Sequence, residues 1–120
     1  MLKDKLFSIQ EINRDGDQIY AVLSLNKEHI IFKGHFPDAP VLPGVAMMQM
    51  VKELLEVVEE RALFIEKAGN MKFLRMVNPV NTPILNMEIS ILERLNKTIR
   101  IKAQILDQQT VCFKMTALLV

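Results

Sequence analysis

The feature that most constrains the fold of this chain is a strict alternation of apolar and polar residues in its second half. Apolar side chains occupy every second position in three segments, 85–91, 99–105 and 111–117. Because successive side chains of a strand point to opposite faces, each segment predicts a strand with one buried and one wet face. The breaks between them, "ERLNK" and "DQQ", are short and polar, which predicts antiparallel hairpins. On this pattern Cys112 belongs to the wet face.

Three further strands are expected outside this region. "LFSIQEI" (6–12) and "QIYAVLSL" (18–25) flank a turn at 14–17 and predict a hairpin. "MKFLRMV" (71–77) predicts another strand, which ends in the turn-rich stretch "NPVNTP".

A single helix is expected between the two groups of strands. Apolar residues recur at helical spacing from Val45 to Val58, and Pro43 and Gly44 stand at the start, where proline is tolerated. The first two turns are apolar almost all round, which predicts a helix enclosed on every side. One buried sheet face and one enclosed helix predict an α+β unit whose sheet curls around the helix and leaves a flank for another subunit.

Composition excludes several classes of function. A chain of 120 residues with half of them hydrophobic predicts one domain, residues 1–120, and contains no apolar run long enough to span a membrane. A net charge of +1 argues against nucleic acid as a partner. One cysteine and two histidines leave neither a disulfide nor a metal site, so we expect no cofactor. The charged N-terminus predicts no signal peptide, and the lone cysteine predicts a reducing cytoplasm.

The loop before the helix carries the most specific motif. "GHFPDAPVLPGV", residues 34–45, resembles the active-site loop of the hot-dog-fold (3R)-hydroxyacyl-[acyl-carrier-protein] dehydratases, usually G-H-F-P-G-x-P-x-x-P-G-V. It departs at Asp38, where glycine is common. The stretch 78–91 resembles the family's Pro-Val turn and the strand after it. The resemblance implies a hot-dog fold, a homodimer or an assembly of dimers with acyl tunnels at the interface, and a substrate carried on acyl carrier protein.

The same resemblance assigns roles to the loop residues. Dehydration needs a base near working pH, a donor for the developing enolate and an acid for the leaving hydroxyl. His35 is implied as the base, the backbone N–H of Gly44 as the donor to the thioester carbonyl, and the carbonyl of Val41 as the group that fixes the imidazole tautomer. The remaining expected substrate contacts are Phe36, Pro43 and Val45.

The acid of the family is missing from this chain. The family places a glutamate or aspartate fourteen residues after its histidine, and here that position is Gln49. An amide donates a hydrogen bond but delivers no proton at neutral pH, and losing one acid or base costs about 10²–10⁴-fold in rate. Glu53, one helical turn further on, and Asp38 are the alternative acids.

Recognition of the acidic carrier protein also departs from the family pattern. The family's basic residues precede the proline of the Pro-Val turn, where this chain has Val77 and Asn78. The cations that remain nearby in sequence are Lys33, Lys72 and Arg75.

Structural interpretations stand beside these functional ones. Gln49 is equally a buried amide bonded to backbone across a dimer, and His29 is a surface or packing residue. The methionines are expected to fill the core. The charged residues expected to form a solvated helix end are Lys52, Glu53, Glu56, Glu59 and Glu60.

Three classes of function therefore stay open. The first is dehydration of 3-hydroxyacyl thioesters, in fatty acid synthesis or a related lipid or polyketide-like pathway. The second is hydrolysis of acyl thioesters on the same fold, which is less favoured without a carboxylate at position 49. The third is a non-catalytic acyl-binding or partner subunit that has lost the family's acid.

Overall fold

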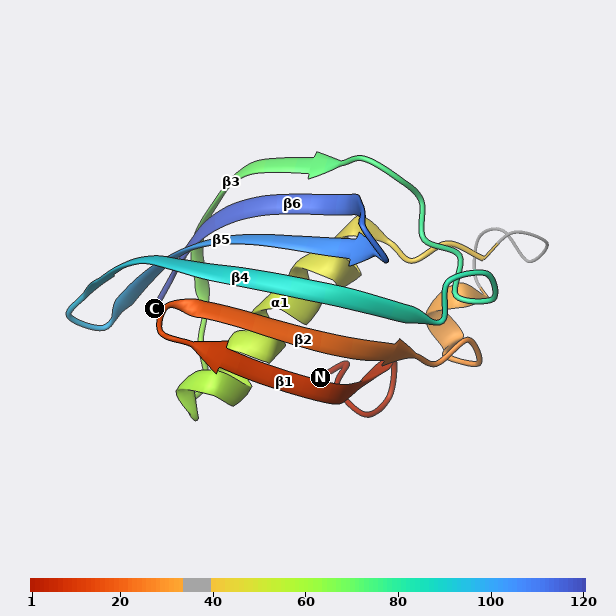
Figure 1. Ribbon diagram of the computed structural model, residues 1–120, viewed down its shortest axis with the longest axis horizontal. Coiled ribbons are helices and arrows are strands. Elements are labelled where there is room, and N and C mark those ends of the chain that lie inside the picture. Colours follow the sequence, from red (N-terminus) through yellow and green to blue (C-terminus); the bar gives the residue numbers. More distant parts are fainter. Residues whose placement is uncertain (34–39) are drawn as a thin grey trace.

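A six-stranded antiparallel sheet curves around one helix (Figure 1). The computed structural model describes residues 1–33 and 40–120. The sheet order is β1-β2-β4-β5-β6-β3. The elements are β1 (Phe7–Asp15), β2 (Gln18–Leu25), a short 3-10 helix η1 (Ile30–Phe32), α1 (Gly44–Glu59), β3 (Ile65–Phe73), β4 (Ile84–Leu95), β5 (Thr98–Asp107) and β6 (Thr110–Leu119). This is the hot-dog architecture, so the expected α+β fold class is confirmed.

The predicted hairpins are all present. β1 and β2 join at Gly16, whose φ of +60° suits a residue without a Cβ, and β2 has the predicted bounds. β4 and β5 are longer than predicted, because most of "ERLNK" continues the strands and Asn96 makes the turn at a φ of +57°. In Figure 1 this hairpin projects beyond the rest of the sheet.

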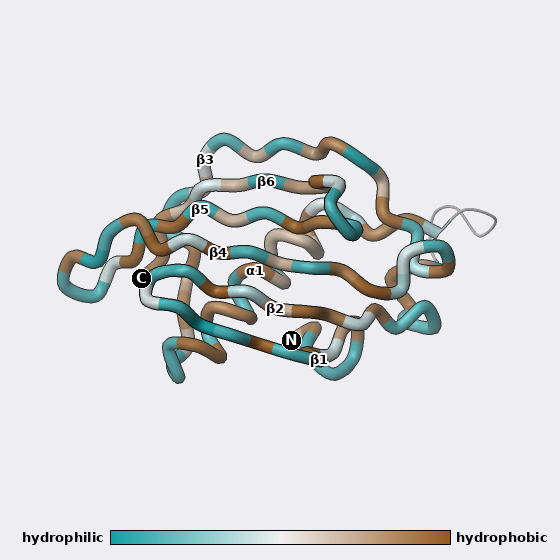
Figure 2. Tube along the Cα trace, in the orientation of Figure 1, coloured by the Kyte–Doolittle hydropathy of each residue, from teal (hydrophilic) through white to brown (hydrophobic). Residues whose placement is uncertain are grey.

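The core lies between the concave face of the sheet and α1. The register aligns the inward side chains in rows that cross four strands, and one row is Ile19, Ile89, Ala103 and Met115. A second row is Ala21, Met87, Ile105 and Phe113. The helix residues Met50, Leu54 and Leu55 are fully buried against this face. Each such large side chain contributes about 1.5–3 kcal/mol on burial. Figure 2 shows the alternation along the strands that produces this division.

The strand predicted at 71–77 lies earlier in the chain than expected. β3 covers Ile65–Phe73 and pairs only with β6, at the edge of the sheet that the structure describes. Its residues are mostly exposed, so "IEKAGN" shows no apolar alternation to mark a strand. After Phe73 the chain turns away, with the N–H groups of Leu74 and Arg75 both donating to the carbonyl of Cys112, at 2.8 and 3.3 Å.

Cys112 is buried, so its expected place on the wet face is wrong. The register steps from Ile105–Phe113 to Leu106–Val111, which leaves Cys112 as the extra residue of a β-bulge. The bulge turns two consecutive side chains, Cys112 and Phe113, toward the interior. Burial raises the pKa of the Cys112 thiol.

The helix is not enclosed on every side within one chain. The core face of α1 is buried, but the side chain of Val45 is 68% exposed in its first turn. The expectation of complete enclosure is therefore wrong for the isolated chain. The exposed helix surface around Val45, called the open stripe below, is of the kind that the sequence predicts for contact with another subunit.

Candidate functional site

The start of α1 presents backbone N–H groups without a side-chain cap from the described residues. Pro43 is the N-cap residue, and its carbonyl accepts hydrogen bonds from the N–H groups of Ala46 at 3.1 Å and Met47 at 3.2 Å. The N–H groups of the first two helical residues, Gly44 and Val45, have no acceptor within the helix, and the helix dipole adds partial positive charge there. This helix end can therefore polarise a ligand oxygen that lies close to it.

A cavity of about 370 Å³ opens at this helix start. The segment before α1 and the segment after β3 form its walls. They are held together by a hydrogen bond from the N–H of Leu42 to the carbonyl of Val77, at 2.8 Å. Among the described residues the lining is apolar except for one cation, Arg75. The lining residues are Val41, Leu42, Pro43, Gly44, Met47, Phe73, Leu74, Arg75 and Met76.

An aromatic ring lies directly on Gly44 at the helix start. A Cβ at this position would lie 2.1 Å from Cε1 of Phe73, far inside van der Waals contact. The ring of Phe73 is 58% exposed and leans on Phe113, with centroids 5.2 Å apart. Glycine therefore lets the ring of Phe73 cover the first turn of α1 closely and form one wall of the cavity.

The sequence predicts seven candidate site residues, and the structure brings three of them together. Val41, Pro43 and Gly44 line the cavity at the start of α1. Val45 points outward from the same turn. His35 and Phe36 lie outside the described residues.

The other histidine has a structural contact. His29 precedes η1, and its Nδ1 accepts a hydrogen bond from the N–H of Ile31 at 3.0 Å. This cap fits the packing role expected for His29.

Gln49 is half-buried and hydrogen-bonded along its own helix. Its Nε2 donates to Oε2 of Glu53 at 2.8 Å, an i,i+4 contact. Gln49 does not line the cavity at the helix start.

Glu53 is fully buried, so its expected place in a solvated helix end is wrong. Its carboxylate accepts hydrogen bonds from the backbone N–H of Leu2, at 3.0 and 2.9 Å, and of Lys3, at 2.8 Å. The N-terminal segment folds back over the helix, with the N–H of Leu6 donating to the carbonyl of Leu2. No local pattern marks a contact between residues about fifty positions apart, and sequence reasoning therefore missed it.

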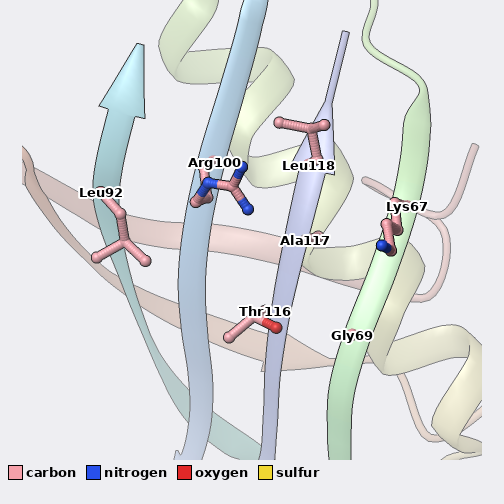
Figure 3. Close-up of a pocket in the computed structure, with 7 residues that line it drawn as sticks. All are labelled: Lys67, Gly69, Leu92, Arg100, Thr116, Ala117 and Leu118. Atoms are coloured by element: carbon pink, nitrogen blue, oxygen red, sulfur yellow. The ribbon is translucent and has the colours of Figure 1, made fainter.

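A second hollow, of about 410 Å³, lies on the outer face of the sheet (Figure 3). Figure 3 shows α1 behind the strands, on the far side from the exposed side chains. The titratable groups among its described lining residues are Lys67 and Arg100, and Thr116 supplies a hydroxyl. The described lining includes no histidine or carboxylate that could take a proton from a substrate, so this hollow is no candidate for proton abstraction.

The described residues hold no group of three or more metal-ligating side chains. Within the same ranges, no helix is long and apolar enough to cross a membrane.

A curved antiparallel sheet around one helix, with an apolar cavity at the glycine start of that helix, defines a hot-dog protein. A family model described as ApeI-like, ApeI dehydratase, matches residues 11–115, and the chain belongs to this family. The expected relation to hot-dog dehydratases is confirmed.

Known proteins agree with this assignment. The 3-hydroxyacyl-[acyl-carrier-protein] dehydratase FabZ of Oceanobacillus iheyensis is 29% identical over 96 residues, which cover 74% of this chain and 66% of that relative. The chain thus spans just under two thirds of that relative's length. The dehydratase heterocomplex ApeI:P from Xenorhabdus doucetiae superposes with a TM-score of 0.72 at 18% identity, covering 92% of this chain and 95% of the other. The putative thioesterase yhdA from Lactococcus lactis reaches 0.68 at 12% identity, covering 97% and 91%, so the two structures establish the fold alone.

Proposed function

We propose that this protein dehydrates 3-hydroxyacyl thioesters carried on an acyl carrier protein to trans-2-enoyl thioesters. The observation that carries the proposal is the apolar cavity at the uncapped start of α1, in a chain of the ApeI-like dehydratase family. An apolar cavity suits an acyl chain, and a helix N-terminus suits an oxygen that gains negative charge. The same inference assigns the protein to the cytoplasm as one domain, residues 1–120.

The reaction begins with loss of a proton from C2 of the substrate. His35 takes this proton, and the carbonyl of Val41 accepts the other imidazole N–H and so fixes the tautomer. The N–H of Gly44 stabilises the negative charge on the thioester oxygen. Phe36, Pro43 and Val45 contact the acyl chain.

The second half of the reaction is loss of hydroxide from C3. The electron pair of the broken C2–H bond forms the C2=C3 double bond, the C3–O bond breaks, and the leaving hydroxide takes a proton and departs as water. Because Gln49 delivers no proton, we propose that the proton taken by His35 is returned to the leaving hydroxyl and that Gln49 contributes a hydrogen bond. The proton removed from C2 then leaves in the water molecule, and no carboxylic acid is needed.

The working unit we propose is a homodimer that covers the open stripe of α1. Val45 is exposed one helical turn before Gln49, so a second chain seated there would enclose both. The structurally similar Xenorhabdus dehydratase is found as a heterocomplex, which supports an assembly of more than one chain.

Recognition of the carrier is assigned to cations near the cavity. Arg75 lines the cavity and is exposed, and Lys33 and Lys72 are exposed on neighbouring segments. An acidic carrier protein would meet these charges as its acyl group enters the cavity.

The test is turnover of a purified 3-hydroxyacyl carrier substrate, with products separated by mass. Enoyl thioester is expected from the wild type and is lost in His35→Ala. His29→Ala is the matched control, because that histidine caps η1, and it should retain activity. Equal turnover in His35→Ala would overturn the assignment. Release of free acid would identify a thioesterase, and acyl-carrier binding without either product would identify a non-catalytic partner subunit.

A further inference from the structure

Glu53 is a fully buried carboxylate whose hydrogen-bond partners are all donors. Two are backbone N–H groups of the N-terminal segment, from Leu2 and Lys3, and the third is the side-chain amide of Gln49. Burying a carboxylate is costly unless donors surround it, and these donors meet that need. Among the described residues Gln49 is the one side chain that bonds to Glu53.

This bond decides which way the Gln49 amide faces. A carboxylate oxygen can accept only from the nitrogen end of an amide, so contact with Glu53 excludes the flipped orientation of Gln49. One N–H of Nε2 and the whole of Oε1 then remain for a further partner such as a ligand. A hydroxyl group both donates and accepts, and this pair of groups can hold it in one orientation.

Both oxygens of Glu53 are already engaged, which argues against Glu53 as the missing acid. Oε1 accepts from Leu2 and Lys3, and Oε2 accepts from Leu2 and Gln49. The side chain is also fully buried. Its effect on the reaction must therefore pass through Gln49.

We propose that Glu53 is the positioning residue that holds the Gln49 amide in the orientation needed to bind the 3-hydroxyl of the substrate. The N-terminal segment takes part, because Leu2 and Lys3 fix the carboxylate through their backbone N–H groups. This inference rests on the proposed function, in which Gln49 contacts the leaving hydroxyl.

The first variant is Glu53→Gln, which keeps the size of the side chain but replaces one acceptor with a donor. The oxygen of the new amide can still accept from Leu2 and Lys3, which turns its NH₂ group toward Gln49. The Gln49 amide must then flip and accept through Oε1, so its orientation is lost. We expect kcat to fall about tenfold or more with little change in KM, because the lost orientation matters when the C3–O bond breaks. Glu56→Gln is the matched control, since Glu56 bonds to Lys52 and Leu63 and should leave kcat unchanged.

The second variant exchanges the pair, Gln49→Glu with Glu53→Gln. The amide now at position 53 would accept from Leu2 and Lys3 through its oxygen. Its nitrogen would donate to the carboxylate now at position 49, so the bond is restored with reversed polarity. The exchange is expected to recover at least the kcat lost in Glu53→Gln and to add an ionisation to the pH–rate profile. A double variant whose defect equals the product of the two single defects would overturn the proposal, because independent residues show such additivity.

A measurement without turnover separates this inference from the proposed function. In ¹⁵N NMR spectra the Gln49 side-chain amide should show one N–H proton shifted downfield by Glu53, and the shift should disappear in Glu53→Gln while the backbone spectrum stays folded. If the wild type turns over no 3-hydroxyacyl substrate, the proposed function fails although the NMR result can stand. If the wild type is active and the amide signal does not respond to Glu53→Gln, the positioning role fails alone.

Discussion

At its first turn α1 carries apolar side chains and backbone N–H groups that receive no side-chain cap from the described residues. Toward its end it carries carboxylates that bond to other parts of the fold. Pro43 supplies no side-chain cap, and Val45 points outward. At the other end Glu53 holds the N-terminal segment, Glu56 accepts from the N–H of Leu63, and Glu59 pairs with Arg94 of β4.

The difference assigns binding to one end of the helix and anchoring to the other. Backbone N–H groups that no side chain satisfies are available to a ligand oxygen. Carboxylates that accept hydrogen bonds from other parts of the fold instead fix the position of the helix. Figure 1 shows the helix running from beneath the β5–β6 side at its start to the β1 edge at its end, so the two ends meet different parts of the sheet.

The largest effect is expected at the binding end, from Gly44→Ala. The added methyl group would lie 2.1 Å from the ring of Phe73, so either the ring or the helix start must move. Displacement of the groups that orient substrate should lower kcat/KM by about 10²-fold or more.

Two further variants control this prediction. Gly44→Ala combined with Phe73→Ala removes the obstructing ring and should recover part of the loss. Gly69→Ala, whose methyl group would lie 3.1 Å from Oγ1 of Thr116 on the outer hollow, should leave kcat/KM close to wild type. Unchanged kcat/KM in Gly44→Ala would contradict the assignment of substrate binding to the start of α1.

The next effect belongs to the anchoring end. Glu53→Ala leaves the N–H groups of Leu2 and Lys3 without their acceptor and should lower the free energy of unfolding by about 2–3 kcal/mol. Glu56→Ala, whose residue accepts from one backbone N–H, should cost about 1 kcal/mol. Urea unfolding of both variants measures the two losses of unfolding free energy. Equal losses would contradict a larger anchoring role for Glu53 than for Glu56.

A smaller effect concerns the mouth of the cavity. Arg75→Glu reverses the charge among the described lining residues and should raise KM for an acidic carrier-bound substrate about tenfold. A small thioester without the carrier should show little change, because only the protein partner meets this charge. Lys67→Glu, on the outer face of the sheet, is the matched control, and an equal effect there would argue for general charge attraction.

The smallest effect is expected from Arg94→Met. The hydrogen bond from Arg94 holds the pKa of the Glu59 carboxyl below its ordinary value of 4.5. Because the folded pKa is depressed, the pair stabilises the fold above the ordinary value and loses that effect as pH falls through the folded pKa. Arg94→Met should cost about 0.5–1 kcal/mol at pH 7. Chemical unfolding at pH 7 and at lower pH checks this, and a cost that does not shrink in acid would contradict the assignment.

The sequence predicts those parts of the fold whose signal is local. β2, β5 and β6 follow from alternation, and the start of α1 from Pro43 and Gly44, since both signals depend on neighbouring residues. β3 begins before the predicted strand because an exposed edge strand needs no apolar face. The bulge at Cys112 is not predictable in this way, because one inserted residue reverses the alternation without changing the composition.

The candidate site was predictable to a similar degree. Val41, Pro43 and Gly44 came from a motif, and the structure gathers them around one cavity. Phe73 and Glu53 act through contacts with residues distant in sequence, Gly44 and Leu2, which no periodic pattern encodes. His35 stands on the motif alone.

Because of the bulge in β6, the buried thiol of Cys112 can report local separation of β5 from β6. Cys112 is the sole thiol of the chain and has no exposed surface, so an alkylating reagent can reach it only when the β5–β6 seam separates. The rate of labelling by a thiol reagent therefore measures how often β5 and β6 separate locally, and no engineered probe is needed. Acyl ligands that tighten the molecule would slow this labelling and could be ranked by it.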